Sequence, residues 1–219
     1  MSSSSVPVRL SVDKSVDRLV VLISGAGSNL QAILDACASG ELAAQVAAVI
    51  ANKRDAFGLE RARRANVPAI HQPKLQTQTR QGYDSELADL VASYQPDWVV
   101  LAGWMRVLSS AFLDRFPNRV VNLHPALPGA FPGTHAIERA FETYRRGEIA
   151  HTGVMVHLVP DEGVDSGPVL AQEIISIQPD DTLESLEARI HTVEHRLLVS
   201  TLQTLTQNSH SNSQGHSHA

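Results

Sequence analysis

The sequence alternates short apolar runs, rich in β-branched residues, with helical patterns, and this alternation limits the folds open to the chain. Helices provide the crossover connections that parallel strands require. The succession therefore predicts an α/β fold with a doubly wound, mostly parallel, Rossmann-like sheet and helices on both of its faces. The expected strands are 18–25, 43–52, 68–73, 97–104 and 119–125, and the expected helices are 28–40, 56–67, 82–95 and a short one within 109–116.

The pattern changes after residue 135. A helix expected at 135–147 is followed by two β-rich runs, at 151–160 and 167–177, joined by the acidic turn DEGVDS. Their close succession predicts that they pair with each other, so that an antiparallel strand makes the sheet mixed at one edge. A final helix is expected over 182–206, because acidic and capping residues crowd its start.

Composition indicates one folded domain with polar ends. Hydrophobic residues make up 43% of the chain and charged residues 19%, as in soluble globular proteins. We assign the folded domain to 18–206, preceded by a disordered extension at 1–17 and followed by a disordered polar tail at 207–219. The tail contains several histidines, but a disordered tail is favoured there over a metal site.

Charge and cysteine content restrict partners and compartment. The net charge of −5 argues against a nucleic acid or an anionic membrane as the main partner. No run approaches the roughly 20 apolar residues of a membrane span, and the N-terminal segment lacks the pattern of a secretion signal. The single cysteine, Cys37, excludes an internal disulfide and is favoured as a small packed residue over a reactive thiol. A cytoplasmic protein is expected.

The turn after the first strand, GAGSNL at 25–30, is typical of an anion site. Glycines let backbone amides approach a phosphate, and the N-terminus of the following helix favours negative charge. A dinucleotide fingerprint would need a third glycine where Leu30 stands, and an acid after the second strand, which ends in Ala51-Asn52-Lys53. A pocket for one phosphate is therefore favoured over NAD, with a plain tight turn as the alternative.

Asn122 and His124 stand two apart where a strand gives way to proline and glycine. Residues at this spacing share one face of a strand, so both side chains should project together while Leu123 turns into the core. Ligands of open α/β sheets bind at the carboxyl ends of the strands. Asp165, in the acidic turn at 161–167, can reach this edge, and a carboxylate beside a histidine can orient it, hold its charged form or relay a proton.

Other chemistries lack their motifs. The sequence has no G-x-S-x-G nucleophile elbow, no Walker A lysine, and no H-E-x-x-H or spaced cysteine set for zinc. If the chain is an enzyme, it is expected to use Asn, His and Asp on a carbonyl without a covalent intermediate and without a metal. His71, His151, His157 and His191 are interpreted as structural. In GWMRVL at 103–108, the Trp and Met could wall an apolar site and the Arg could meet an anion, although core packing is the alternative.

Taken together, these segments resemble the glycinamide ribonucleotide formyltransferases, folate-dependent enzymes of purine biosynthesis. The resemblance extends from about Leu19 to Leu205. The segments that carry it are ISGAGSNLQAI, NKRDAFGLERA, VVLAGWMRVLS, NLHPAL with FPGTHA, HTGVMVHLV and DEGVDSGPVLAQ.

The resemblance implies direct transfer of a formyl group from 10-formyltetrahydrofolate, a co-substrate and not a permanently bound cofactor, to the amine of 5′-phosphoribosylglycinamide, in the synthesis of IMP. Asn122, His124 and Asp165 match the family's catalytic residues. In that role Asn122 and a protonated His124 would donate to the oxyanion, while Asp165 would tune the pKa of His124.

The resemblance also assigns binding residues. The phosphate loop is matched by Gly27, Ser28 and Asn29, and a carboxylate that holds ribose hydroxyls by Glu194. His135 is expected close to the site, in support of Asp165. For the folate, the matching residues are Met105, Arg106, Val107 and Leu108 at the pterin wall, Asn122 beside them, and Arg80 near the folate tail.

The sequence departs from the family pattern in two loops. After His-Pro the family commonly has Ser-Leu-Leu-Pro, whereas this chain has Ala126-Leu-Pro-Gly129, which leaves the path of that loop open. Pro160 adds one residue between His157 and Asp165. A slightly longer loop is therefore expected, with Asp165 still in place.

Three other functions are alternatives to the glycinamide ribonucleotide formyltransferase. A 10-formyltetrahydrofolate hydrolase would carry a regulatory domain ahead of this fold, and a methionyl-tRNA formyltransferase would carry a further C-terminal domain and a more basic surface. A non-catalytic nucleotide-binding module is the third, since fold does not fix function. The combination of Asn122, His124 and Asp165 favours the formyltransferase, with small-molecule partners only; a homodimer is left open.

Overall fold

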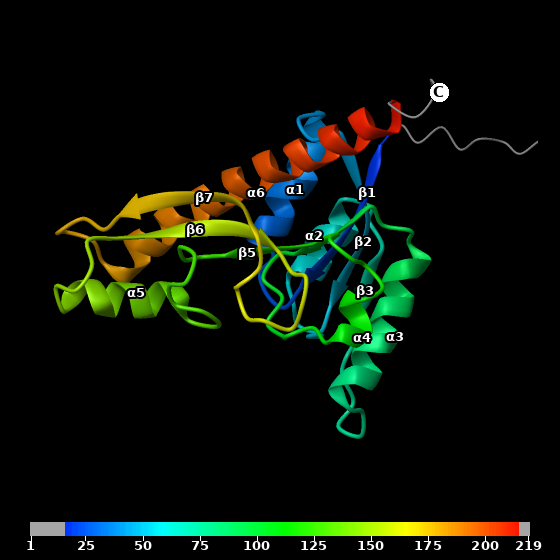
Figure 1. Ribbon diagram of the computed structural model, residues 1–219, viewed down its shortest axis with the longest axis horizontal. Helices are drawn as coiled ribbons and strands as arrows, with labels where there is room; N and C mark the ends of the chain where they lie inside the picture. The colour runs from blue at the N-terminus through cyan, green and yellow to red at the C-terminus, as the bar shows by residue number, and fades with distance from the viewer. Residues whose placement is uncertain (1–15, 215–219) are drawn as a thin grey trace, which may run out of the picture.

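The chain forms a seven-stranded sheet in the order β3-β2-β1-β4-β5-β6-β7, with helices on both sides (Figure 1). This computed structural model describes residues 16–214, with side chains through residue 208. The strands are β1 (Asp17–Ile23), β2 (Ala44–Ala51), β3 (Ala69–His71), β4 (Trp98–Leu101), β5 (Val120–His124), β6 (His151–Leu158) and β7 (Val169–Ser176). The helices are α1 (Ser28–Ser39), α2 (Gly58–Arg64), α3 (Arg80–Ser93), α4 (Ser110–Leu113), α5 (Ala136–Arg145) and α6 (Leu183–Gln214).

The strand directions confirm the predicted mixed sheet. β1 lies at the centre and is parallel to both β2 and β4, and the pairs β2–β3 and β4–β5 are also parallel. β6 is antiparallel to β5 and to β7, so it is the strand that runs against the others. Leu158, the last residue of β6, pairs with Val121 of β5. The loop at 159–168 therefore starts beside β5.

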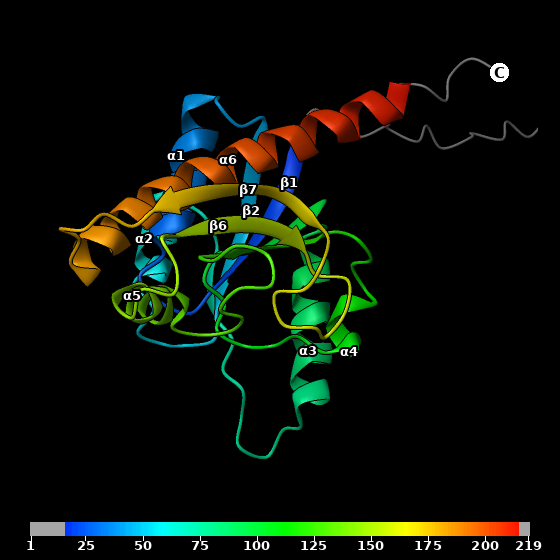
Figure 2. The same ribbon diagram turned by 60° about the vertical axis from the view of Figure 1, so that its left-hand side comes forward.

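Both faces of the sheet are buried, as the apolar runs of the sequence predict. Along β1, Leu19, Val21 and Ile23 enter one core, whereas Val20 and Leu22 enter the other. The first core is completed by residues of α1, α2, α5 and α6, and the second by residues of α3 and α4. The two views of the ribbon show α1 and α6 on one side of the sheet and α3 and α4 on the other (Figures 1 and 2).

Several helix boundaries differ from the predicted ones: α2 ends at Arg64 instead of residue 67, α5 ends at Arg145 instead of residue 147, and the changes in α3 and α6 have identifiable causes. α3 begins at Arg80, two residues before the expected start, because the Thr79 hydroxyl accepts a hydrogen bond from the Gly82 amide (3.0 Å) and caps the helix. α6 continues beyond Thr206 to Gln214. A nucleated helix gains one hydrogen bond for each added residue, and no glycine or proline interrupts the chain before Gly215. The expected extension at 1–17 lies outside the described residues up to residue 15, as does the tail from 215.

The loop that departs from the family pattern has a defined path. Ala126 is fully buried, and the Ala130 amide donates to the Leu127 carbonyl (3.0 Å) across a turn formed by Pro128 and Gly129. Gly129 has a φ of 77°, and proline followed by a glycine with positive φ is the pair favoured in a type II turn. The loop thus reverses immediately after β5 without losing its anchor in the core.

Cys37 is partly buried in α1, and burial raises the pKa of its thiol to about 11. The reactive thiolate is therefore scarce at neutral pH, in line with the interpretation of Cys37 as a packed residue. Among residues 16–214, no helix combines the length and apolar character needed to cross a membrane.

Asp181 fastens the start of α6 to the end of β7. Its carboxylate, only 5% exposed, forms an ion pair with Arg189 and accepts hydrogen bonds from the Gln178 amide (2.7 Å) and the Ser185 hydroxyl (2.7 Å). The Arg189 side chain also donates to the carbonyl of Ser176, the last residue of β7 (3.2 Å). The contact with Arg189, assisted by these hydrogen bonds, lowers the pKa of Asp181 to about 2.

We expect Asp181→Asn to lower the free energy of unfolding by about 1–2 kcal/mol at pH 7. Because the folded-state pKa is depressed, this contribution is present above pH 3.8 and is lost as the pH falls toward 2. Urea unfolding at several pH values tests this, with the exposed Asp180→Asn as the matched control. A difference between Asp181→Asn and wild type that persists undiminished at pH 2 would contradict the assignment.

Candidate functional site

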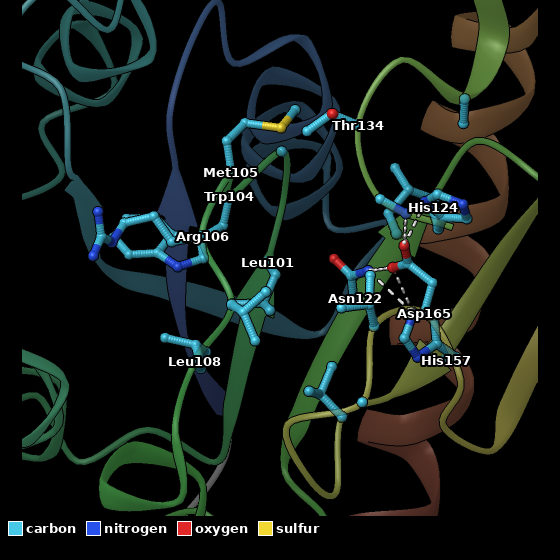
Figure 3. A pocket seen from close by; sticks show the side chains of 18 of the residues that line it. Leu101, Trp104, Met105, Arg106, Leu108, Asn122, His124, Thr134, His157 and Asp165 are labelled. Carbon is cyan, nitrogen blue, oxygen red and sulfur yellow. Dashed lines mark hydrogen bonds and ion pairs between the residues drawn. The ribbon is translucent and has the colours of Figure 1, made fainter. Parts of the chain in front are cut away.

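The carboxyl ends of β4 and β5 open into a cavity of about 240 Å³. Apolar side chains of Leu101, Trp104 and Leu108 form one wall, and the opposite wall carries polar side chains from β5, from β6 and from the loop at 159–168 (Figure 3). These polar side chains are Asn122, His124, His157 and Asp165. An apolar pocket with a few convergent polar groups is the usual form of a small-molecule site.

Asp165 lies at the centre of the polar wall. One carboxylate oxygen, Oδ1, accepts a hydrogen bond from Asn122 Nδ2 (3.0 Å), and the other, Oδ2, accepts one from the Gly133 amide (2.8 Å). His124 Nδ1 lies 3.3 Å from Oδ2. The structure thus brings together the three residues that the sequence singled out, and it places Asn122 and His124 on the same side of β5, as their spacing predicts.

Contacts hold Asp165 in its charged form. Burial opposes ionisation, but the contacts with His157, the Gly133 amide and His124 outweigh it, so the pKa of Asp165 lies below its usual value. The residue has a φ of 51°, a left-handed conformation that is uncommon outside glycine. Such strain persists only where surrounding contacts impose it, and here it aims the carboxylate at the end of β5.

His124 is almost fully buried, and both of its ring nitrogens face acceptors. Nδ1 faces Asp165, and Nε2 lies 3.1 Å from the carbonyl oxygen of Phe131. Burial lowers the pKa of His124, although Asp165 and the Phe131 carbonyl oppose the change. Burial therefore favours the neutral imidazole, whereas the two acceptors favour the protonated donor expected from sequence. When His124 is protonated, Asp165 and the Phe131 carbonyl can each accept a hydrogen bond from one ring nitrogen.

His157 is the site residue that sequence reasoning missed. It is 1% exposed, its Nε2 lies 3.1 Å from Asn122 Nδ2 and 3.6 Å from Asp165 Oδ1, and its Nδ1 lies 2.8 Å from the Leu158 carbonyl. A carbonyl only accepts, so Nδ1 carries hydrogen and fixes the ring. The available signal was a histidine inside the apolar run HTGVMVHLV; its partner is set by the β5–β6 register, which pairs Asn122 with His157.

His135 does not support Asp165 as expected. It precedes α5 with a φ of 58°, its side chain is 74% exposed, and its Nδ1 lies 2.9 Å from Glu138 Oε1. The residue lines the cavity, but the histidine that contacts Asp165 from a neighbouring element is His157. The sequence did not show which of the two histidines contacts Asp165. The β5–β6 register decides it, because it pairs His157 with Asn122.

The GAGSNL turn forms a backbone cradle at the start of α1. Gly27 precedes the helix with a φ of 71°, and no side chain of the described residues caps the helix. A Cβ on Gly27 would lie 2.7 Å from the Gly58 Cα, so the two backbones approach as closely as glycine allows. Arg61 Nε donates to the Ala26 carbonyl (2.8 Å). Uncapped amides, the helix dipole and a nearby guanidinium together suit an anion.

Glu194 of α6 joins this cradle from far along the chain. It is 4% exposed, and its Oε2 accepts hydrogen bonds from Asn29 Nδ2 (3.3 Å) and His191 Nδ1 (2.7 Å). The Glu194 hydrogen bond raises the pKa of His191 despite partial burial. Ser28 and Asn29 open α1, so the structure places Glu194 beside the residues that the sequence assigned to a phosphate. His191 was interpreted as structural, and its contact with Glu194 gives it a place at the edge of this cluster.

The residues predicted to bind the folate lie in two places: Met105–Leu108 line the cavity, and Arg80 lies outside it. Met105, 61% exposed, and Val107, 41% exposed, line the cavity and are not core positions. Leu108 and Trp104 also line the cavity, but both are buried in the core. The Arg106 guanidinium lies 5.0 Å from the centre of the Tyr83 ring.

Arg80 lies outside the cavity lining, where it pairs with Glu162, whose Oε1 accepts from the Ser110 amide (3.0 Å). Arg80 thus anchors the loop that carries Asp165. Within the described part of the chain, no group of three or more His, Cys, Asp or Glu residues is arranged to hold a metal ion.

Comparisons with known proteins consistently indicate one family. The formyl transferase family model matches residues 17–202. The phosphoribosylglycinamide formyltransferases of Dictyostelium discoideum and Schizosaccharomyces pombe are 45% and 46% identical to this chain, covering 86% and 88% of it and 97% and 99% of their own lengths. The crystal structure of glycinamide ribonucleotide transformylase 1 from Symbiobacterium toebii superposes with a TM-score of 0.83 at 40% identity, over 94% of each chain.

We expect His157→Ala to raise the pKa of Asp165, because the variant loses a contact that favours the ionised carboxylate. The carboxyl ¹³C shift of Asp165, followed by NMR against pH, measures the change. His151→Ala, at an exposed position of the same strand, is the control and should leave the titration unchanged. Identical Asp165 titrations in His157→Ala and wild type would show that His157 does not hold the charge.

Proposed function

The chain belongs to the formyl transferase family, and on that premise we propose that it transfers the formyl group of 10-formyltetrahydrofolate to the amine of 5′-phosphoribosylglycinamide, in de novo synthesis of IMP. The observation that carries the proposal is the convergence of Asn122, His124 and Asp165 on one cavity. A carboxamide, an imidazole and a carboxylate in hydrogen-bond contact suit acyl transfer between nitrogen atoms, because such a reaction needs oxyanion donors and a proton route.

The two substrates are assigned to neighbouring strand ends of one sheet. The phosphate of the ribonucleotide binds at Gly27–Asn29, after β1, and its ribose hydroxyls bind Glu194. The pterin of the folate lies against Met105–Leu108, after β4, with the formyl group directed at Asn122 and His124 of β5. β1, β4 and β5 are adjacent in the sheet, so a molecule held at β1 can extend its amine toward β5.

The reaction starts when the neutral amine of the glycinamide attacks the formyl carbon. A bond forms between the amine nitrogen and this carbon, the carbonyl oxygen becomes an oxyanion, and the nitrogen becomes an ammonium. Asn122 Nδ2 is the donor for the oxyanion. An amide NH2 has two hydrogens, and in the free protein this nitrogen faces Asp165 Oδ1 (3.0 Å) and His157 Nε2 (3.1 Å), while Figure 3 shows the carboxamide oxygen pointing away from Asp165. Substrate binding must therefore exchange one of these two contacts.

His124 and Asp165 move the proton. The neutral imidazole accepts a proton from the ammonium, directly or through a water molecule, and Asp165 stabilises the resulting imidazolium. The tetrahedral intermediate then collapses: the bond between the formyl carbon and the folate nitrogen breaks, and this nitrogen takes the proton back from His124. Tetrahydrofolate and the formylated ribonucleotide leave, and the histidine returns to its neutral form.

The rival functions predict different products. A hydrolase would release formate from 10-formyltetrahydrofolate in the absence of the amine, and a nucleotide-binding module would bind the ribonucleotide without turnover. A spectroscopic assay with purified protein, glycinamide ribonucleotide and a 10-formylfolate donor separates the three. Folate product that forms only when the amine is present supports the proposal.

We expect Asn122→Ala, His124→Ala and Asp165→Asn each to lower kcat by about 10²–10³-fold, the usual cost of losing a donor or a proton relay. Asp165→Asn keeps the shape of the side chain, removes its charge and replaces one acceptor oxygen by an NH2 donor. Asp114→Asn is the control, because it removes a carboxylate charge at an exposed position after α4. Wild-type turnover by the Asp165 variant would overturn the mechanism, provided that circular dichroism shows a native fold.

We expect Glu194→Gln to raise KM for the ribonucleotide by about 10-fold or more with little change in kcat, because a charged hydrogen-bond acceptor for the ribose is lost equally in ground and transition states. KM for the folate should not change. Glu184→Gln, at the exposed start of the same helix, is the control. A rise in the KM for the folate instead would contradict the assignment of Glu194 to the ribonucleotide.

A further inference from the structure

Arg139, in α5, holds a loop whose backbone touches both His124 and Asp165. Its Nη2 donates to the carbonyl oxygens of Phe131 and Pro132, each at 2.7 Å, and its Nε donates to that of His135 (3.3 Å). The guanidinium also lies 5.9 Å from the centre of the Phe131 ring. One cation thus binds three carbonyls of the segment 131–135.

This segment is conformationally strained. Phe131 has a φ of 48°, Gly133 of 81° and His135 of 58°. Residues other than glycine are held in this left-handed region at a cost of about 1–2 kcal/mol each, and they remain there only when other contacts impose it. Three residues with positive φ lie within the five positions 131–135, so this segment requires stabilising contacts such as the hydrogen bonds from Arg139.

The same loop supplies one contact to each of two site residues. The Phe131 carbonyl, which Arg139 binds, also faces His124 Nε2 at 3.1 Å. The Gly133 amide donates to Asp165 Oδ2 at 2.8 Å. The far nitrogen of the imidazole and one oxygen of the carboxylate are therefore both contacted by backbone groups of the segment that Arg139 binds.

We propose that Arg139 is a positioning residue for formyl transfer: it holds the 131–135 loop in the conformation in which the Phe131 carbonyl orients His124 and the Gly133 amide orients Asp165. The inference rests on the proposed function, since it concerns the efficiency of that reaction. A lysine could not take the place of Arg139, because an ammonium offers one nitrogen, whereas the rigid guanidinium binds the Phe131 and Pro132 carbonyls through Nη2 and the His135 carbonyl through Nε at the same time.

Loss of the fork should also change the titration of the site. The titratable groups that face His124 are Asp165 and His157, and those beside Arg139 are His135 and Glu138. The Gly133 amide favours ionised Asp165, so a displaced loop raises the pKa of Asp165. The Phe131 carbonyl favours protonated His124, so the same displacement lowers the pKa of His124. In the proposed mechanism the reactive form combines the ionised carboxylate with the neutral imidazole, so a lower pKa of His124 extends this form to lower pH.

The test compares Arg139→Lys and Arg139→Gln with Arg146→Gln, which alters an exposed arginine at the end of the same helix that pairs with Glu148. We expect both Arg139 variants to lose about 10- to 100-fold in kcat, the scale of a small misplacement of catalytic groups, with KM for both substrates changed less than about 3-fold. The acid limb of the pH profile of kcat should move to lower pH, and millimolar methylguanidine should partly restore kcat of a third variant, Arg139→Ala. Arg146→Gln should match wild type.

Exchange of the Gly133 amide hydrogen, followed by NMR without substrate, tests independently of activity whether Arg139 holds the 131–135 loop. We expect faster exchange in Arg139→Lys and Arg139→Gln than in Arg146→Gln. Unchanged exchange together with a wild-type kcat and pH profile would overturn the inference, as would equal losses in all three variants. If wild-type protein transfers no formyl group, the proposed function fails, and the exchange measurement still decides whether Arg139 holds the loop. If Arg139→Gln does not fold, Arg139→Lys carries the test.

Discussion

The site depends on one buried carboxylate. An ionised carboxylate removed from water is costly unless it is paired and hydrogen-bonded, so Asp165 requires partners from every element around it. Those partners come from β5 through Asn122 and His124, from β6 through His157, and from the 131–135 loop through Gly133. Displacement of any of these elements would leave the charge unsatisfied, and the carboxylate therefore couples the geometry of two loops to that of the sheet.

The antiparallel strand makes this coupling possible. β6 runs against β5, so the chain leaves the sheet beside Val121 and the loop that follows carries Asp165 back to Asn122 and His124. At its outer side the loop is fastened by Glu162 to Arg80 and to the Ser110 amide. A purely parallel sheet would have needed a long crossover at this point. The mixed edge thus serves the chemistry as well as the fold.

Three of the six non-glycine residues with positive φ in the described chain lie where the proposed reaction takes place. Phe131, His135 and Asp165 all adopt left-handed backbone conformations, and all belong to the two loops that meet at the polar wall. These conformations lower stability, and the hydrogen bonds of Arg139 and Asp165 offset part of the loss. The phosphate cradle relies on glycine instead, because Gly27 must approach Gly58 too closely for a side chain. The two ends of the site therefore use different means to hold an unusual backbone.

The sequence by itself determined the layered fold, the mixed edge of the sheet and the shared face of Asn122 and His124, because the periods of strands and helices are local properties of the chain. Resemblance to a family added the remaining expected residues. Only the tertiary structure decided that His157, and not His135, contacts Asp165, and that Arg80 anchors the Asp165 loop. It also decided that burial lowers the pKa of His124 and that α6 continues to Gln214. Contacts between distant residues depend on strand register and loop path, and pKa values depend on burial. No local pattern in the sequence records either.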